Sequence, residues 1–255
     1  MPPRIGLQLY TLRDAIAADL RGTLERVAAI GYRGVETAFF GVVLPLNAPE
    51  LLRDLGLDVF AAHTNLPFGH DAAPALRAAE ALGSPRLVWH GWPRDDAYDN
   101  RDGVMRLAER FNEAGQNVAA EGRQFLIHNH WWECEPLPET GRPALELLLA
   151  ELDPAIGFEF DAYWAAFAGV DPIATIADLG HRMGLLHLKD GPILRHDSMC
   201  ALGSGRMNLA EILTAAGDSP AWTVVELDEV DGDPWSAIAA SLAWLTGRQS
   251  SPLPS

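Results

Sequence analysis

The chain is poor in lysine and has no long apolar run, and both absences exclude classes of protein. Lys189 is the only lysine among 255 residues, and no cluster of Lys and Arg offsets the formal net charge of −16. Such an acidic surface repels nucleic acid and anionic membranes. No segment approaches the roughly eighteen uninterrupted apolar residues of a membrane span. We therefore expect neither nucleic acid nor a membrane as a partner.

Cysteine is also scarce, and the beginning of the sequence has none of the features of a signal peptide. Cys134 and Cys200 suit a reducing compartment better than a disulfide framework, and without a Cys-x-x-Cys pair they are not expected to bind zinc. The stretch MPPRIGLQLY lacks a basic region followed by a long apolar core and a small-residue cleavage site. We therefore expect no signal peptide and a cytoplasmic location.

What the chain does contain is a regular alternation of short apolar runs and longer amphipathic ones. Strands are predicted at 4–10, 32–36, 57–63, 85–91, 123–130, 155–161, 182–190 and 221–228. Helices are predicted at 19–31, 49–56, 73–83, 101–122, 142–152, 170–180, 208–217 and 233–245. Eight strand–helix units without a composition break indicate a parallel sheet and favour a closed (β/α)8 TIM barrel. We expect one domain over residues 1–247 and a disordered tail over 248–255.

In such a barrel the functional residues follow the carboxyl ends of the strands. These positions hold Gln8 and Tyr10, then Glu36, His63, His90, His128 with His130 and Glu133, Asp161, His187 with Lys189 and Asp190, and Glu226 with Asp228. Loops are polar in any protein, which explains one or two such residues but not an imidazole or a carboxylate after seven of the strands. Period-two alternation places His128 with His130, His187 with Lys189, and Glu226 with Asp228 on shared faces. A site that mixes imidazole and carboxylate suits Mn²⁺, Co²⁺, Zn²⁺ or Fe²⁺.

The same residues carry a resemblance to a known family. The runs IGLQLYTLRD, GYRGVE, IHNHWWE, GFEFDAYWAAFAGVDP and LLHLKDG resemble the xylose isomerase-like TIM barrel superfamily, the sugar phosphate isomerase/epimerase group, over nearly the whole chain. The resemblance implies one divalent metal ion (Mn²⁺, Co²⁺, Zn²⁺, Fe²⁺ or Mg²⁺), held by a carboxylate after the fifth strand and by Asp161, His187 and Glu226. At the fifth strand the chain departs from the epimerase pattern, because His128 stands where a Glu is expected. Members with His-Asn-His carry a Glu just downstream, so we expect Glu133 as the ligand, with His128 as the alternative.

The resemblance further implies an isomerase or epimerase that acts on a sugar or keto-polyol and transfers a proton through an enediolate held by the metal. Glu226 or the pair His128 and His130 is expected as the base, and Lys189 as an electrophile or hydrogen-bond donor. A lyase, either an inosose-type dehydratase or a 3-keto-glycoside eliminase, is the alternative, because a histidine at the fifth strand weakens a scheme with two glutamates. We give less weight to an abasic-site endonuclease, which needs several metals and a basic face, and to a non-catalytic sugar-binding barrel.

A small carbohydrate is the expected partner, and homo-oligomerisation is left open. The residues expected to contact this substrate are Gln8, Tyr10, Glu36, His63, His90, Trp131 and Trp164. Tryptophan rings near the strand ends either pack the rim of the barrel or stack on the C–H faces of a sugar. Three of the candidates have structural alternatives: Lys189 as an ion-pair partner of Asp161 or Glu226, and His63 and His90 as capping or core histidines. The loop GSGR (203–206) is interpreted as a tight turn rather than a phosphate site.

Overall fold

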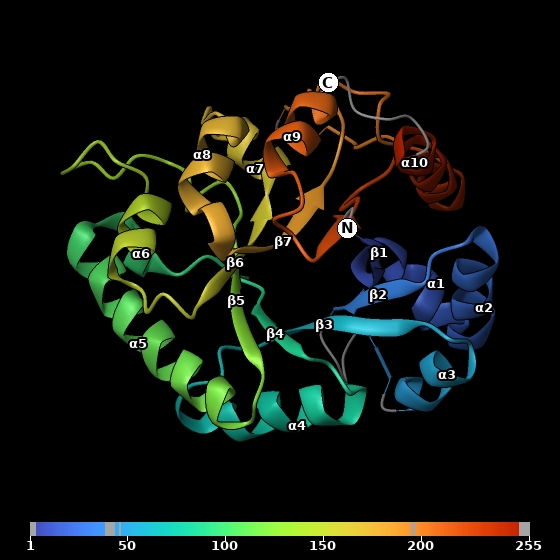
Figure 1. Cartoon of the computed structure of the whole chain (residues 1–255), viewed down its shortest axis with the longest axis horizontal. Coiled ribbons are helices and arrows are strands. Elements are labelled where there is room, and N and C mark those ends of the chain that lie inside the picture. The colour runs from blue at the N-terminus through green and yellow to red at the C-terminus, as the bar shows by residue number, and fades with distance from the viewer. Residues whose placement is uncertain (1–3, 39–43, 46, 195–196, 250–255) are drawn as a thin grey trace.

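Eight parallel strands form a closed barrel in which each strand pairs with the next along the chain and the last pairs with the first (Figure 1). The structure is a computed structural model, and it describes residues 4–38, 44–45, 47–194 and 197–249. The strands are β1 (Arg4–Gln8), β2 (Gly34–Thr37), β3 (Asp58–Thr64), β4 (Arg86–Trp89), β5 (Gln124–His128), β6 (Gly157–Asp161), β7 (Met183–Leu188) and β8 (Trp222–Val225). The predicted (β/α)8 barrel is confirmed.

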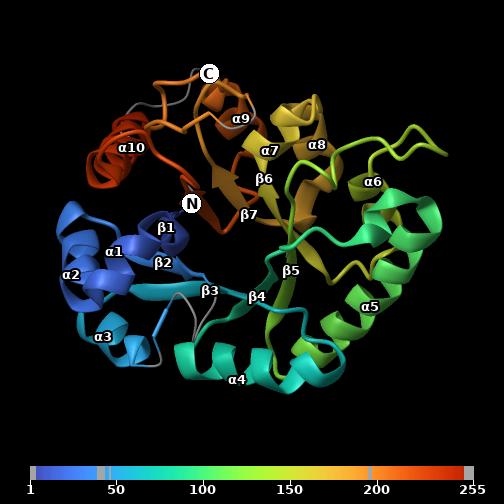
Figure 2. The same cartoon turned by 180° about the vertical axis from the view of Figure 1, so that it is seen from behind.

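Helices surround the barrel on all sides (Figures 1 and 2). The predicted ones are α2 (Leu20–Ile30), α3 (Ala48–Asp54), α4 (Ala72–Leu82), α5 (Arg101–Ala120), α6 (Ala144–Glu151), α8 (Pro172–Leu179), α9 (Leu209–Ala216) and α10 (Pro234–Gln249). The structure adds α1 (Arg13–Ala18), α7 (Ala162–Phe167) and the 3-10 helices η1 (Leu9–Leu12), η2 (Gly69–Asp71), η3 (Asp96–Asp99) and η4 (Gly180–Arg182). Within the described ranges, every helix is too short or too polar to cross a bilayer.

The element bounds differ from the predictions mainly where the chain leaves the barrel. β1, β4, β5, β7 and β8 end two or three residues before their predicted ends, because the polar residues beyond those points no longer pair with a neighbouring strand. α10 runs to Gln249, two residues into the segment expected as a tail, and residues 250–255 lie outside the described part. The residues beyond these strand ends, among them His130, Lys189 and Glu226, lie next to strand residues such as His128, Asp161 and His187, and together they can form a site.

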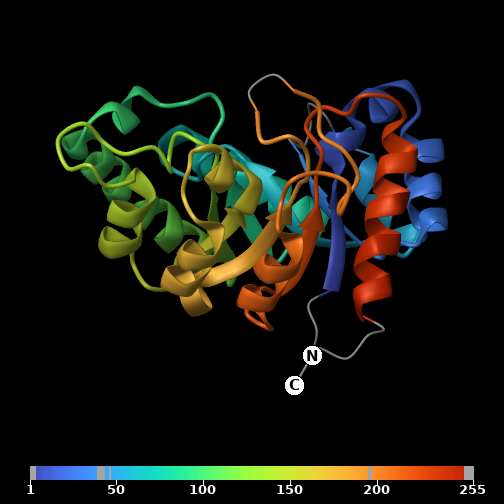
Figure 3. The ribbon, with the colours of Figure 1, turned by 90° about the horizontal axis from the view of Figure 1, so that it is seen from above.

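The interior of the barrel is filled by apolar side chains from the start of the strands up to the level of His63 and His187. Phe60, Ala61, Val88, Leu126, Leu185, Trp222 and Val224 form a separate buried cluster there. The rings of Phe60 and Trp222 are stacked with centroids 4.3 Å apart, and they lie against Gly6 and Gly34, which have no side chain to displace them. The long loops gather at the other end of the barrel, away from the start of β1 (Figure 3). A site can therefore open only at the carboxyl ends of the strands.

We predict that Gly34→Ala destabilises the barrel by about 1–3 kcal/mol, the usual cost of overpacking a core. A methyl group at Gly34 would collide with the Trp222 ring and press on Phe60. Urea unfolding measures the loss. The matched control is Gly247→Ala in α10, where an added methyl group meets no atom within 4 Å apart from its chain neighbours and its own helix backbone. Equal stability of Gly34→Ala and the unmodified protein would contradict the packing described.

Candidate metal centre and substrate cavity

A cavity of about 470 Å³ opens at the carboxyl ends of the strands, and every strand or the segment after it contributes to its wall. The wall contains nine of the residues predicted for the site: Tyr10, His63, His90, His128, His130, Trp131, Trp164, Lys189 and Glu226. The other predicted residues, Gln8, Glu36, Glu133, Asp161 and His187, are fully buried outside this wall. Most of the predicted set is thus brought to one place.

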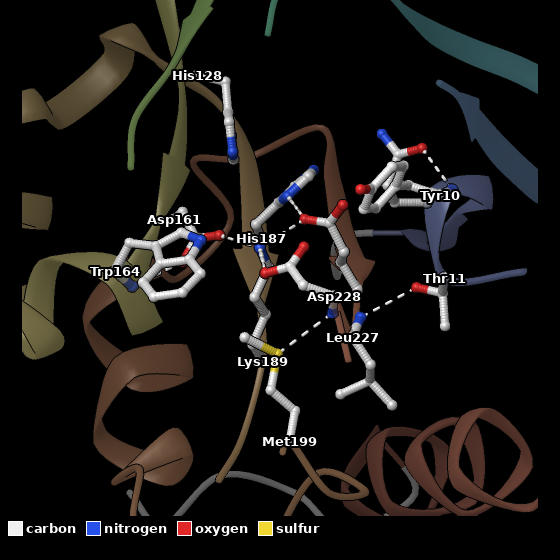
Figure 4. Close-up of polar contacts among 12 residues, drawn as sticks. Tyr10, Thr11, His128, Asp161, Trp164, His187, Lys189, Met199, Leu227 and Asp228 are labelled. Carbon is white, nitrogen blue, oxygen red and sulfur yellow. Dashed lines mark hydrogen bonds and ion pairs between the residues drawn. The ribbon is translucent and has the colours of Figure 1, made fainter. Parts of the chain in front are cut away.

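Four predicted residues form what we call the outer group: His128, Asp161, His187 and Glu226. Each offers a nitrogen or carboxylate oxygen, and these four atoms lie within 4.8 Å of one another. All four side chains are buried, at the ends of β5 and β6, in β7, and just after β8. Figure 4 shows His128, Asp161 and His187 turned toward the same region. Two imidazoles and two carboxylates are a donor set that Mn²⁺, Fe²⁺, Co²⁺ and Zn²⁺ accept.

Asp161 is held in place by the residue that follows β5. The Asn129 side chain accepts a hydrogen bond from the Asp161 amide at 2.9 Å and donates one to the Asp161 carbonyl at 3.2 Å, which ties the two strand ends together. The Asp161 Oδ1 atom accepts the amide hydrogen of Trp164 at 2.9 Å and so caps α7 directly after β6. Oδ2 is left for a cation. In the structure it lies 3.0 Å from the Lys189 ammonium.

A second set, the inner group, consists of Glu36, His63, Glu159 and His187. The His63 Nε2 atom lies 2.7 Å from Glu159 and 3.3 Å from Glu36. The His187 Nε2 atom lies 2.7 Å from Glu36 and 3.2 Å from Glu159. Glu159 was not among the predicted residues, because only the last residue of its strand was considered. It stands two residues before Asp161 in GFEFD, so period-two alternation was the signal that could have found it.

His187 belongs to both groups, and each ring nitrogen faces a different one. Its Nδ1 atom lies 3.0 Å from Glu226, whereas Nε2 faces Glu36 and Glu159. A neutral imidazole has one lone pair and one N–H, so it can give a metal ion only one of its nitrogens. A ligand histidine commonly donates its remaining N–H to a carboxylate, and Glu36 is in place to accept that bond from Nε2. The geometry therefore suits one ion, on either the outer or the inner group.

The chain's only lysine lies among three carboxylates. The Lys189 Nζ atom is 3.0 Å from Asp161, 2.8 Å from Glu226 and 2.7 Å from Asp228, and it lies 5.2 Å from the centre of the Trp164 ring. Burial alone would lower the pKa of Lys189, but the three carboxylates outweigh it and raise the pKa well above its usual value. Lys189 is thus both a structural ion-pair partner and part of the cavity wall.

The histidines divide into charged and neutral ones. Burial alone would lower the pKa values of His63 and His187, but the charges of the inner glutamates outweigh this effect. The pKa of His63 is raised to about 10, and that of His187 is raised well above its usual value. Burial, reinforced by neighbouring histidines, lowers the pKa of His128, lowers that of His130 well below its usual value and brings that of His90 to about 3. The neutral imidazoles keep a lone pair, which a metal ion or a proton can take.

Glu133 is in neither group, and the structure brings His128 to the other three residues of the outer group in its place. The chain turns back after β5, where the amides of Cys134 and Glu135 both donate to the Trp131 carbonyl. This turn directs the Glu133 side chain toward Gly91, and its Oε2 atom accepts the His130 amide hydrogen at 2.8 Å. Burial raises the pKa of Glu133 to about 8.

Several other predicted residues have local structural partners. The Gln8 side chain accepts the amide hydrogen of Tyr10 at 3.1 Å and starts η1. The His90 Nδ1 atom accepts the amide hydrogen of Trp92 at 3.0 Å, which agrees with the capping alternative for this histidine. In the GSGR loop the amides of Gly203 and Gly205 donate to the Asp190 carboxylate at 2.9 and 3.0 Å. These two amides already have an anionic partner, as expected for a turn held by the protein itself.

The cavity wall also contains residues that the sequence did not single out: Arg13, Tyr163, Phe167, Leu194 and Met199. Tyr163 and Phe167 come from α7, which was not predicted because it begins at Asp161 without an intervening loop. Two contacts hold the segment after β8 beside the cavity (Figure 4). The Met199 sulfur lies 3.3 Å from the Asp228 amide, and the Thr11 hydroxyl accepts the Leu227 amide hydrogen at 3.0 Å.

The residues present fit a divalent cation. Five carboxylates meet around the two groups: Glu36, Glu159, Asp161, Glu226 and Asp228. Without an ion, three side chains there carry positive charge, His63, His187 and Lys189, and the carboxylates are in excess. An ion bound to His187 would displace one of the two ring protons of this histidine. Uncompensated buried charge is costly, and a cation in the outer group would reduce it.

Comparisons with known proteins agree with this architecture. A family model described as xylose isomerase-like TIM barrel matches residues 24–248. An uncharacterised protein of Mycobacterium leprae (strain TN) is 27% identical over an alignment of 258 positions that covers 88% of each chain. The crystal structure of a sugar phosphate isomerase/epimerase from Parabacteroides distasonis ATCC 8503 superposes with a TM-score of 0.79 at 25% identity, covering 96% of this chain and 94% of that one. A probable 3-DHS dehydratase from Bacillus anthracis has a TM-score of 0.75 at 14% identity, covering 96% and 99%, and shows the fold alone.

We predict that Glu133→Gln becomes more stable relative to the unmodified protein as the pH rises. The pKa of the Glu133 carboxyl group is about 4.5 in the unfolded chain and about 8 in the folded protein. Between these two values the unfolded chain loses the proton first, so the free energy of unfolding of the unmodified protein falls as the pH rises. The amide of the Glu133→Gln variant does not ionise in this range, so the variant lacks this loss of stability. Urea unfolding at pH 5 and 8.5 should show the difference grow by about 2–4 kcal/mol. A difference that does not change with pH would show that Glu133 is not buried as a neutral acid.

Proposed function

The chain belongs to the xylose isomerase-like TIM barrel family, and on this basis we propose that it is an isomerase or epimerase of a small carbohydrate. The proposed reaction moves a proton at the carbon next to a carbonyl group, with one divalent metal ion as cofactor. The observation that carries the proposal is the convergence of His128, Asp161, His187 and Glu226 beside a cavity of sufficient size for a sugar. The structural neighbour from Parabacteroides distasonis, named a sugar phosphate isomerase/epimerase, supports the reaction class.

We assign the ion to the outer group rather than to the inner one. His128 and Glu226 line the cavity, whereas His63 is the only inner-group member among the described residues of its wall. The ion, which is Mn²⁺, Co²⁺, Zn²⁺, Fe²⁺ or Mg²⁺, supplies Lewis acidity when bound and makes the adjacent C–H more acidic. Glu36 then keeps His187 in the required tautomer, because it lies 2.7 Å from Nε2 and accepts its hydrogen.

Glu226 is the proposed base. Its contacts with Lys189 and His187, at 2.8 and 3.0 Å, are both made by Oε2, which leaves Oε1 for the proton of a substrate in the cavity. His130 is the proposed second proton-transfer group, because its ring lines the cavity and lies 4.9 Å from that of His128. β5 and β8 are three strands apart in the barrel, so the two groups reach a substrate from different sides. Lys189 is the proposed hydrogen-bond donor to a substrate oxygen: its ammonium faces Asp161, Glu226 and Asp228 in the structure, and an ion that binds Asp161 and Glu226 would free an N–H for the substrate.

A lyase is the second candidate. The observation that favours it is the histidine pair, because an imidazole beside the cavity can donate a proton to a leaving oxygen in a dehydration or glycoside elimination. The neighbour from Bacillus anthracis is named a probable dehydratase. A nuclease is not proposed, because it requires several metal ions and a basic face, whereas the two groups here share His187 and the chain has a net charge of −16.

Metal content separates the outer group from the inner one. We predict about one divalent ion per chain after loading and desalting, measured by inductively coupled plasma mass spectrometry. His128→Gln should lose this ion, because His128 belongs only to the outer group. His63→Gln is the matched variant, since His63 belongs only to the inner group, and it should keep the ion. The reverse pattern, or two ions per chain, would contradict the assignment.

Proton exchange tests the reaction itself. We predict that the metal-loaded protein incorporates solvent deuterium into at least one member of a panel of ketohexoses, ketopentoses and inososes, observed by NMR. Glu226→Gln should slow this exchange by about a hundredfold or more, the usual contribution of a general base. Glu211→Gln, a surface change on α9, should leave it unaltered. Exchange that persists in Glu226→Gln would show that another group removes the proton.

A further inference from the structure

Two large hydrophobic side chains are exposed in the part of the chain that the structure describes. Trp92, which follows β4, and Leu194, in the segment after β7, are each 56% exposed, and within the described ranges no other large hydrophobic side chain is classed with them. Both line the cavity. Single exposed hydrophobic residues are ordinary, but here the two belong to one opening. This placement indicates a surface that an apolar group covers when a ligand is bound.

An aromatic wall continues from this rim into the cavity. The ring centroid of Trp131 lies 5.0 Å from that of Trp164 and 5.8 Å from that of Phe167, and the three rings pack at steep angles. Trp132 connects them with Trp92, at 4.6 Å from Trp131 and 5.7 Å from Trp92. The rings hold one another in place, so the wall is a formed surface onto which a flat group can stack.

The rest of the cavity wall is mostly polar, and its Lys189 ammonium lies next to the aromatic wall, 5.2 Å from the centre of the Trp164 ring. His63, His128, Lys189 and Glu226 belong to this polar part, and these are the residues assigned to the metal and the proton transfer or placed beside them. The cavity volume of about 470 Å³ lies in the range of roughly 300–1,000 Å³ that holds drug-sized ligands. One polar side and one apolar side in a cavity of this size fit a ligand with two chemically different parts.

We propose that the substrate is a keto-sugar bearing an aromatic substituent, such as the aryl glycoside of a keto-sugar, with the sugar at the polar side and the aryl ring between the aromatic wall and the rim formed by Trp92 and Leu194. The inference rests on the proposed function only in taking the polar part of the ligand to be a keto-sugar. The competing occupant of the rim is a second copy of this chain, which would cover Trp92 and Leu194 in a dimer.

Calorimetric titration with matched glycosides tests this inference. Phenyl and methyl β-D-glucopyranoside, and the same pair of galactosides, differ only in the aglycone, and none has a carbonyl group that could react. We expect the metal-loaded protein to bind at least one phenyl glycoside about tenfold more tightly than its methyl counterpart. The double variant Trp92→Ala/Leu194→Ala should reduce this preference to less than about threefold without weakening the methyl glycoside. Trp235→Ala in α10, outside the cavity wall, is the control and should keep the full preference.

Three results would overturn the inference: no measurable binding of any of the four glycosides, equal affinity for the phenyl and methyl forms, or a preference that persists in the double variant. A fourth such result would come from light scattering: the unmodified protein is a dimer and the double variant is a monomer. Failure here is distinguishable from failure of the proposed function. If deuterium exchange is absent but the phenyl preference stands, only the reaction is wrong; if exchange occurs without the preference, only the aryl substituent is wrong.

Discussion

The site depends on the position of one imidazole between two sets of carboxylates. His187 faces Glu226 with Nδ1 and the inner glutamates Glu36 and Glu159 with Nε2, and it is fully buried. Its ring can therefore give one nitrogen to a metal ion while the other is bonded to a carboxylate that fixes the tautomer. The inner group would then have a role without a second ion: His63 supplies positive charge beside Glu159, and Glu36 would orient His187 as the proposed ligand.

The order of the chain explains why this arrangement forms. Each strand brings one or two polar side chains to the same end of the barrel, and the stacked rings of Phe60 and Trp222 fill the opposite end. The Asn129 side chain fixes Asp161 relative to β5, and Asp161 in turn starts α7, which places Trp164 and Phe167 in the aromatic wall. A metal-ligand candidate and the hydrophobic side of the cavity are thus positioned by the same short segment. This coupling connects the proposed chemistry with the proposed choice of substrate.

Much of this could be predicted from the sequence, because strand and helix periods are local properties. The eight strands, the eight main helices and the strand-end positions of His128, Asp161, His187 and Glu226 all follow from such patterns. Glu159 obeys the same alternation as Asp161, but it lies two residues before the end of β6, so a rule that selects only the last residue of each strand does not find it. The position of Glu133 could not be predicted: it depends on how the turn after Trp131 folds back against Gly91, and that is a tertiary contact. The same holds for Trp92 and Leu194, whose exposure at one rim involves segments about a hundred residues apart in sequence.

The proposed binding of a single divalent ion between β5, β6, β7 and β8 can be tested directly. Crystals grown with Co²⁺ and measured above and below the cobalt absorption edge would locate the ion directly. We predict one anomalous peak within coordination distance of His128, Asp161, Glu226 and the Nδ1 atom of His187, with Nε2 bonded to Glu36. A peak between Glu36, His63, Glu159 and the Nε2 atom of His187 would contradict it, and so would a peak at Glu133.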